Sequence, residues 1–148
     1  MGTRTCLVLA ALVGAAGCSG LKTYPNEASK NLHVSTQVDP DVRAALHVHE
    51  VTGACMTRYQ GTVALSRPAL DIGIAAEQPT YLVVSFDTSS FMAGSRSSSV
   101  GTLIRARAGY DYELAVSYKQ DIYNVALREI DRRKGVSREL PRRPMTGC

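Results

Sequence analysis

The amino-acid sequence predicts an all-β fold, an antiparallel β-sandwich of about seven or eight strands that follows a flexible N-terminal tether. Three observations support this prediction. Short segments from residue 32 onward alternate apolar and polar residues or are rich in β-branched and aromatic residues, which is typical of strands with one buried face. Turn-forming residues separate these segments. No long segment repeats apolar residues at helical spacing, so several short strands favour a sandwich.

In chain order, the expected strands cover residues 32–38, 45–51, 56–65, 70–75, 80–87, 100–106, 112–119 and 123–130. Residues 88–99 are rich in Ser and Gly and are expected to form a loop. Two assignments keep an alternative open. Segment 123–130 also fits helical spacing through Val125, Ala126 and Ile130, and Asp39-Pro40 also fits the start of a short helix, where proline is tolerated.

The N-terminus carries the pattern of a secretory signal. Arg4 precedes a run without charged side chains over residues 6–16. A helix needs about twenty apolar residues to cross a bilayer. A charged start followed by a shorter apolar run therefore predicts a signal peptide that is removed from the mature protein.

Residues Ala15-Ala16-Gly17-Cys18 close this segment and resemble the lipobox of bacterial lipoprotein signals, with Ala15 where that family most often has Leu. The resemblance implies cleavage after residue 17, a diacylglycerol on the sulfur of Cys18 and often a third acyl chain on its amine. Two or three chains anchor a protein durably in a membrane. Ser19 is not the Asp that retains such proteins at the inner membrane. The resemblance therefore implies an outer-membrane lipoprotein facing the periplasm.

Removal of residues 1–17 leaves 131 of the 148 residues, which is enough for one domain with one core. Residues 18–30 are polar and show no apolar periodicity, and they are expected to form a lipidated tether with a reach of about 20 Å. Residues 31–148 are expected to form the single β-sandwich domain.

Two cysteines remain in the domain, Cys55 and Cys148. An oxidising compartment favours a disulfide between them, worth about 4 kcal/mol in the chain-entropy account of a loop of this length. Free thiols and a metal site are the alternatives. The sequence has no C-x-x-C spacing, which argues against a redox motif and a zinc cluster.

Residue patterns that would identify an enzyme are missing from the sequence. His47 and His49 share one face of an expected strand, where they mark either a metal site completed by His33 or a solvated polar face, and we favour the polar face. There is no G-x-S-x-G elbow around Ser97, and no phosphate-binding loop. The acidic pair Asp111 and Glu113 fits a charged sheet face. We therefore expect no catalytic residue, no metal and no cofactor.

Two features indicate binding partners. Phe91 and Met92 are apolar residues within the expected loop 88–99, where they would anchor a partner protein or fold back over the end of the sandwich. From Arg128 to the C-terminus there are seven basic and three acidic residues. This basic tail suits anionic lipid headgroups or the cell wall. Nucleic acid is not an expected partner in this compartment.

In size, lipid anchor and density of strands, the chain loosely resembles small transthyretin-like β-sandwich lipoproteins, including the lipoprotein of type VI secretion membrane complexes. Gly109-Tyr110-Asp111-Tyr112 also resembles the corner tyrosine of immunoglobulin-like sandwiches. Architecture alone does not identify a function. We expect a non-catalytic structural or protein-interaction module of the envelope. The alternatives are a module that binds peptidoglycan or another glycan, and an accessory lipoprotein of a secretion or assembly complex.

Overall fold

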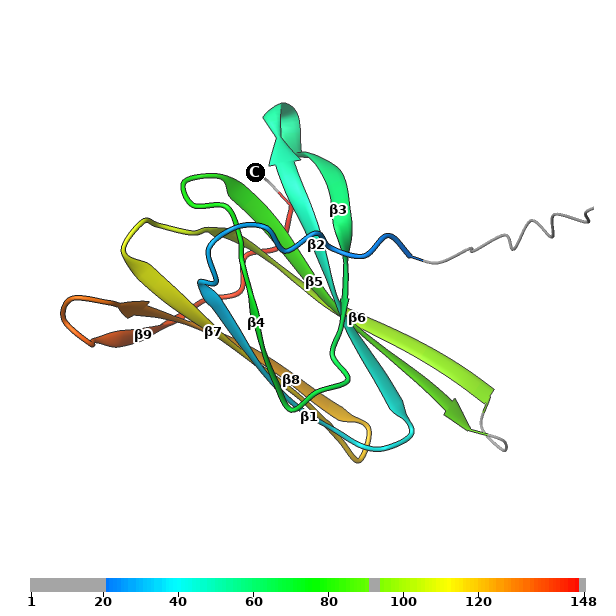
Figure 1. Cartoon of the computed structure of the whole chain (residues 1–148). Helices are drawn as coiled ribbons and strands as arrows, with labels where there is room; N and C mark the ends of the chain where they lie inside the picture. Colours follow the sequence, from blue (N-terminus) through cyan, green and yellow to red (C-terminus); the bar gives the residue numbers. More distant parts are fainter. Residues whose placement is uncertain (1–20, 91–93, 147–148) are drawn as a thin grey trace, which may run out of the picture.

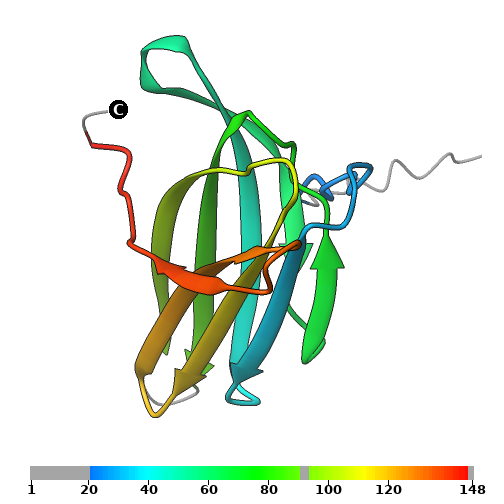
Figure 2. The same ribbon diagram turned by 90° about the vertical axis from the view of Figure 1, so that its left-hand side faces the viewer.

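The described strands of the chain form two sheets packed face to face (Figures 1 and 2). The structure is a computed structural model, and it describes residues 21–90 and 94–146. Its nine described strands are β1 (Leu32–Val38), β2 (Val42–Thr52), β3 (Met56–Ala64), β4 (Ala69–Ile72), β5 (Pro79–Ser90), β6 (Gly94–Arg105), β7 (Tyr110–Lys119), β8 (Ile122–Asp131) and β9 (Ser137–Leu140). A single 3₁₀ turn, η1 (Gly53–Cys55), joins β2 to β3.

One sheet has the strand order β4-β1-β7-β8-β9 and the other has the order β3-β2-β5-β6. Neighbouring strands are antiparallel except β1 and β7, which are parallel. The edge strands are therefore β4 and β9 in the first sheet, and β3 and β6 in the second. The predicted all-β sandwich is confirmed, with nine strands in place of seven or eight.

Alternation of buried and exposed residues explains why the two sheets pack together. In β1, Leu32 and Val34 are buried whereas His33 and Ser35 are exposed. Period-two alternation sends one set of side chains into the space between the sheets. Complete burial of one such aliphatic side chain contributes about 1.5–3 kcal/mol. The largest side chains with almost no exposed surface are Tyr112, Phe86, Leu32, Leu46, Ile72 and Ile74.

The structure resolves the two open assignments. Segment 123–130 lies within strand β8, which pairs with β7 along its whole length. Asp39, Pro40 and Asp41 form the turn between β1 and β2 and no helix. Asp39 explains this turn, because its side chain accepts a hydrogen bond from the backbone N–H of Gln120 at 2.9 Å and ties the turn to the neighbouring β7–β8 turn.

The expectation of a loop over residues 88–99 was wrong for most of that range. Strand β5 continues to Ser90, and β6 begins at Gly94 and pairs with β5 without a shift in register as far as Arg105. Serine-rich sequence misled the prediction because backbone pairing with a neighbouring strand overrides weak strand propensity. Strand β9 was also missed, since its residues are largely exposed and show no clear alternation.

Among residues 21–90 and 94–146, no helix has the length and apolar character needed to cross a bilayer.

Candidate functional site

The N-terminal segment 22–30 docks onto the domain along the β3 edge (blue in Figure 1). The backbone N–H of Thr62 in β3 donates to the carbonyl oxygen of Lys22 at 2.7 Å, and the N–H of Tyr24 donates to the carbonyl oxygen of Thr62 at 3.0 Å. The hydroxyl of Tyr24 donates to the carbonyl oxygen of Gly73 at 2.8 Å. These bonds connect β3 to the chain just after β4, so the segment links edge strands of both sheets.

Two glycines allow this close approach. A Cβ atom on Gly61 would lie 2.5 Å from the Cα of Tyr24, and a Cβ atom on Gly73 would lie 2.1 Å from the carbonyl oxygen of Ala28. Neither distance leaves room for a side chain. Partial burial in this contact raises the pKa of the Tyr24 hydroxyl. The flexible tether expected over residues 18–30 is therefore corrected for residues 22–30, while residues 18–20 lie outside the described residues.

The opposite edge of the same sheet, β6, is largely open. The backbone N–H of Leu103 points away from β5 and donates to the carbonyl oxygen of Arg143 at 2.7 Å. Because backbone groups of alternate residues face the same side of a strand, those of Ser95, Ser97, Ser99 and Gly101 face the same side as Leu103. None of these four residues has a backbone partner on that side within the described part of the chain.

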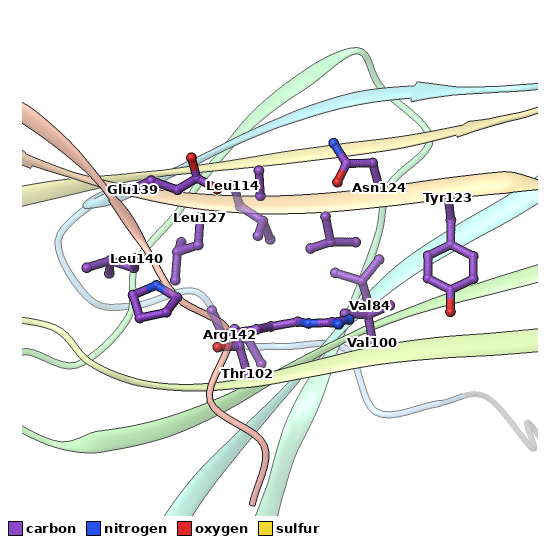
Figure 3. A pocket seen from close by; sticks show the side chains of 14 residues that line it. Val84, Val100, Thr102, Leu114, Tyr123, Asn124, Leu127, Glu139, Leu140 and Arg142 are labelled. Carbon is purple, nitrogen blue, oxygen red and sulfur yellow. The ribbon is translucent and has the colours of Figure 1, made fainter.

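A pocket of about 390 Å³ opens beside this edge, between β6 and β8 (Figure 3). Its floor is formed by core residues such as Leu82, Val84 and Leu114, each at most 1% exposed. Strand β9 pairs only with Leu127 to Ile130 of β8. The first half of β8 therefore has no β9 residue beside it, and this gap leaves the side of the sandwich open.

The side chain of Arg142 lies across the mouth of the pocket and extends toward Val84 and Val100 (Figure 3). Arg142 is exposed and has no ion pair or hydrogen bond with any residue that the structure describes. Glu139 also lines the pocket. Glu139 pairs with Arg128 of β8, and Arg128 is exposed. Paired residues of antiparallel strands point to the same face, so the side chain of Glu139 lies on the outer face of the sheet.

A buried carboxylate lies near the pocket. Glu129 is 4% exposed and accepts hydrogen bonds from Arg107 at 3.1 and 2.5 Å, Arg138 at 2.9 Å and the hydroxyl of Tyr112 at 2.9 Å. Burial alone would raise the pKa of Glu129, but the hydrogen bonds from Arg107, Tyr112 and Arg138 outweigh it and lower the pKa. These hydrogen bonds satisfy the carboxylate of Glu129. We therefore interpret Glu129 as a structural residue that holds β7, β8 and β9 together.

Tyr112 has the hydrogen-bond geometry of the corner tyrosine that the sequence resembles. Its hydroxyl accepts a hydrogen bond from the backbone N–H of Arg107, five residues earlier, at 2.9 Å, which is the contact that defines such a corner. Burial is the main cause of the raised pKa of Tyr112. Asp111, from the predicted acidic pair, forms an ion pair with Arg132 at 2.5 Å, which lowers the pKa of Asp111.

The histidines lie on polar sheet surfaces. His47 and His49 share the outer face of β2, and both ring nitrogens of His47 are within hydrogen-bond distance of hydroxyls, Thr62 at 2.7 Å and Ser85 at 2.8 Å. Burial, followed by the charge of His47, lowers the pKa of His49. His33 is on the other sheet, 2.5 Å from a carboxylate oxygen of Asp71. Across residues 21–90 and 94–146, no group of three or more His, Cys, Asp or Glu is arranged to hold a metal.

The structure describes only some of the predicted site residues. Cys18, Cys148, Phe91 and Met92 lie outside the described residues. Cys55 is exposed in the β2–β3 hairpin, and its thiol is not free. Ser97 and its neighbours lie in strand β6 and not in a loop.

Sequence patterns did not single out Tyr24, Gly73 or Arg142 as site residues. Gly61 did carry a signal, because an isolated glycine inside a strand indicates a bulge or the close approach of another backbone. The structure has both features here, a register shift between Val48 and His49 opposite Gly61 and the docked N-terminal segment.

No protein-family model matches the chain, and no curated protein matches its sequence. Two solved structures resemble it in fold. One is a sea bream transthyretin in complex with thyroxine, with 16% sequence identity, a TM-score of 0.47, and coverage of 66% of this chain and 93% of the other. The second is a transthyretin from Sparus aurata, with 16% identity, a TM-score of 0.49, and coverage of 68% and 98%. Both resemble the chain in fold only and carry no argument about function.

Proposed function

We propose that the chain is a lipid-anchored, non-catalytic protein of the bacterial envelope that binds an extended segment of a partner protein along the open edge of β6. The carrying observation is the row of backbone groups at Ser95, Ser97, Ser99 and Gly101 that face away from β5 without a partner among the described residues. An extended segment adds to such an edge through main-chain hydrogen bonds. The chain itself provides an example, since Arg143 already pairs in this way with Leu103.

Placement of the anchor supports the same proposal. Leu21 is only three residues after Cys18, a span of at most about 10 Å, and the chain is held to β3 from Lys22 onward. A lipid on Cys18 therefore keeps the β3 side of the domain close to the membrane. In the order β3-β2-β5-β6, the open edge is three strand spacings away, about 15 Å. The free edge faces away from the anchored one and stays accessible to a periplasmic partner.

A disulfide between Cys55 and Cys148 belongs to this proposal. The thiol of Cys55 is not free. Both views bring the described C-terminal segment to the end of the molecule where the β2–β3 hairpin lies (Figures 1 and 2). A disulfide there would hold the C-terminal segment against β6 at Leu103. The rest of the β6 edge would then stay open to a partner.

Two experiments test the two halves of the proposal. Cys18→Ser should move the protein from the membrane pellet to the soluble fraction of detergent-free lysates, and an unchanged pellet would contradict the lipid anchor. For the partner, a photo-crosslinking residue at position 99 on the β6 edge should capture one stoichiometric protein, whereas the same residue at exposed position 115, in β7 of the other sheet, should not.

The Ser97→Pro variant serves as the matched test of edge pairing. The N–H of Ser97 faces away from β5, so proline there blocks an added strand without removing a β5–β6 hydrogen bond. Crosslinking from position 99 should then be lost while thermal stability is largely retained. Equal crosslinking from positions 99 and 115, or capture that survives Ser97→Pro, would reject the β6 edge as the binding surface. Retention on purified peptidoglycan without any protein partner would favour the cell-wall alternative.

A further inference from the structure

A smaller cavity, of about 200 Å³, lies between the end of β6 and strand β9, on the side of the sandwich opposite the docked N-terminal segment. The C-terminal segment passes beside it on its way from β9 to β6 (red in Figure 2). Half of the ten lining residues are apolar, and the other half are charged: Arg105, Arg107, Glu129, Arg138 and Arg143. Four guanidinium groups against one carboxylate give this lining a net charge of +3.

Glu129 holds two of these arginines in place without using all of their donors. Its carboxylate accepts two N–H bonds from Arg107 and one from Arg138, whereas each guanidinium carries five N–H groups. The guanidinium of Arg107 also lies 3.9 Å from the ring centroid of Tyr110. Within the described part of the chain, no second acidic side chain pairs with either arginine. Donors that are already held in position lose little conformational entropy when an anion binds.

Arg105 and Arg143 add positive charge that no acidic residue offsets. Neither side chain is ion-paired within residues 21–90 and 94–146. The Nε of Arg105 donates to the backbone carbonyl oxygen of Glu77 at 3.1 Å, while the carboxylate of Glu77 accepts from the N–H of Ala108 and does not line the cavity. The backbone N–H of Arg143 donates to the hydroxyl of Thr102 at 3.2 Å, which holds this residue beside β6. The excess positive charge creates a field that attracts anions.

The volume and charge of the cavity select the class of ligand. Its volume of about 200 Å³ is below the range of about 300–1,000 Å³ that is common for sites enclosing a whole small molecule, so it suits a compact head group. A carboxylate has one charge and two acceptor oxygens, whereas a phosphate monoester has a charge of about −1.5 to −2 and three acceptor oxygens. Guanidinium binds phosphate in a planar, bidentate manner. The net charge of +3 therefore matches a phosphate monoester better than a carboxylate.

We propose that this arginine cavity binds the terminal phosphate of a phosphate monoester. Arg105 and Arg143 pair with the phosphate oxygens. Arg107 and Arg138, which Glu129 holds in place, supply further N–H donors. Two sources carry this group, a soluble phosphate ester and an anionic lipid with a terminal phosphate. The proposal depends neither on the lipid anchor at Cys18 nor on a partner segment at the β6 edge.

The first test titrates the full-length chain, purified in an uncharged detergent, with glycerol phosphate, acetate and glycerol. Calorimetry measures affinity, and backbone amide NMR locates the bound probe. Glycerol phosphate should shift the amides of Leu103, Arg138 and Arg143, which line the cavity. It should bind about tenfold more tightly than acetate, because it offers more charge and more acceptor oxygens, and glycerol should not bind. Added salt should weaken the binding of glycerol phosphate, because these arginines are partly exposed and their charges are screened.

Arg143→Ala should weaken the binding of glycerol phosphate about tenfold, which is the loss of one charge-assisted hydrogen bond. Arg143→Lys should recover only part of this loss, because lysine keeps the charge and lacks the planar fork. Arg67→Ala is the matched control, since Arg67 is exposed between β3 and β4 and does not line the cavity, and its expected effect is less than about twofold. Arg105→Ala should act like Arg143→Ala, and it decides the question if Arg143→Ala does not fold.

Vesicles distinguish the two sources of the phosphate. The Cys18→Ser variant, which lacks the lipid-attachment residue, is mixed with phosphatidylcholine vesicles that do or do not contain phosphatidic acid, a lipid whose head group is a phosphate monoester. Flotation that requires both phosphatidic acid and Arg143 would identify a lipid head group as the ligand. Binding of glycerol phosphate without such flotation would identify a soluble ester.

Three outcomes would overturn the proposal. Equal affinity for glycerol phosphate and acetate would show a cavity without preference for phosphate. An equal effect of Arg143→Ala and Arg67→Ala would show nonspecific attraction to a basic protein. Absence of shifts at the cavity amides, together with absence of flotation that depends on Arg143, would show that no phosphate monoester enters the arginine cavity.

Discussion

The hydroxyl of Tyr24 donates a hydrogen bond of 2.8 Å to the backbone carbonyl oxygen of Gly73, a residue 49 positions later in the chain. The backbone N–H of Gly73 in turn donates to the side-chain oxygen of Asn26 at 2.7 Å. Both bonds exist because Gly73 has no side chain, which allows the N-terminal segment to lie directly on its backbone. This contact converts an expected tether into part of the domain.

Gly73→Ala should destabilise the domain. The new Cβ would lie 2.1 Å from the carbonyl oxygen of Ala28, so the N-terminal segment has to shift or leave, at a cost of about 1–3 kcal/mol. Urea unfolding measures the loss. Gly53→Ala is the matched control, since nothing lies within 4 Å of its Cβ position, and it should change stability by less than about 0.5 kcal/mol. Equal effects of the two changes would argue against docking of the segment.

Tyr24→Phe should lower the free energy of unfolding by about 1 kcal/mol, because it removes one hydrogen bond to Gly73 and keeps the ring in place. Amide hydrogen exchange should quicken at Tyr24 and Thr62, whose backbone groups join the segment to β3. Tyr59→Phe provides a comparison within β3. It removes the bond of the Tyr59 hydroxyl to the carbonyl oxygen of Lys22, which at 3.2 Å is longer and more exposed, together with the contact of that hydroxyl with the hydroxyl of Thr62 at 2.6 Å. Faster exchange throughout the domain in Tyr24→Phe, with no excess at these two amides, would contradict a local role.

Glu129 should make stability depend on pH on the acid side. Its pKa in the folded state is lowered from the ordinary value of 4.5 by hydrogen bonds from two arginines and a tyrosine that outweigh burial. A lowered folded-state pKa contributes stability that is fully present above the unfolded-state value and is lost as the pH falls through the folded-state value. The free energy of unfolding should therefore decrease progressively below about pH 4.5.

Glu129→Gln should remove this contribution. We expect a loss of about 1–3 kcal/mol near neutral pH, at the lower end of buried ion pairs because Arg107 and Arg138 remain partly solvated. The difference between wild type and variant should shrink as the pH is lowered. Asp111→Asn removes a more exposed ion pair with Arg132 and should cost less than about 1 kcal/mol. A difference between Glu129→Gln and wild type that is constant with pH would exclude Glu129 as the titrating group.

Protein extracted from cells under non-reducing conditions should have the mass expected for one disulfide, between Cys55 and Cys148. Cys55→Ser should lower stability by about 4 kcal/mol in the chain-entropy account, because the bridge closes a loop of roughly ninety residues. Amide exchange should quicken at Leu103, where the C-terminal segment pairs with β6. Two free thiols in the extracted protein would contradict this bond.

Much of the fold was predictable because strand alternation is a local property of the sequence. Leu32, Val34 and their exposed neighbours follow period two without reference to any other segment, and the same holds for β7 and β5. Strand β9 and the beginning of β6 were not predictable. Their residues are polar and exposed, and they become strands only because the backbones of β8 and β5 lie beside them.

The sequence by itself determined the class of fold, the signal-like N-terminus with Cys18, and the scarcity of catalytic residue patterns. Only the tertiary structure decided that residues 22–30 dock onto Gly61 and Gly73, that Glu129 is buried among arginines, and that Arg142 lies at the pocket beside the open edge of β6. Each of these contacts joins residues far apart in the chain. The positions of these residues relative to one another depend on how the two sheets pack, and a local pattern of residue types does not predict that packing.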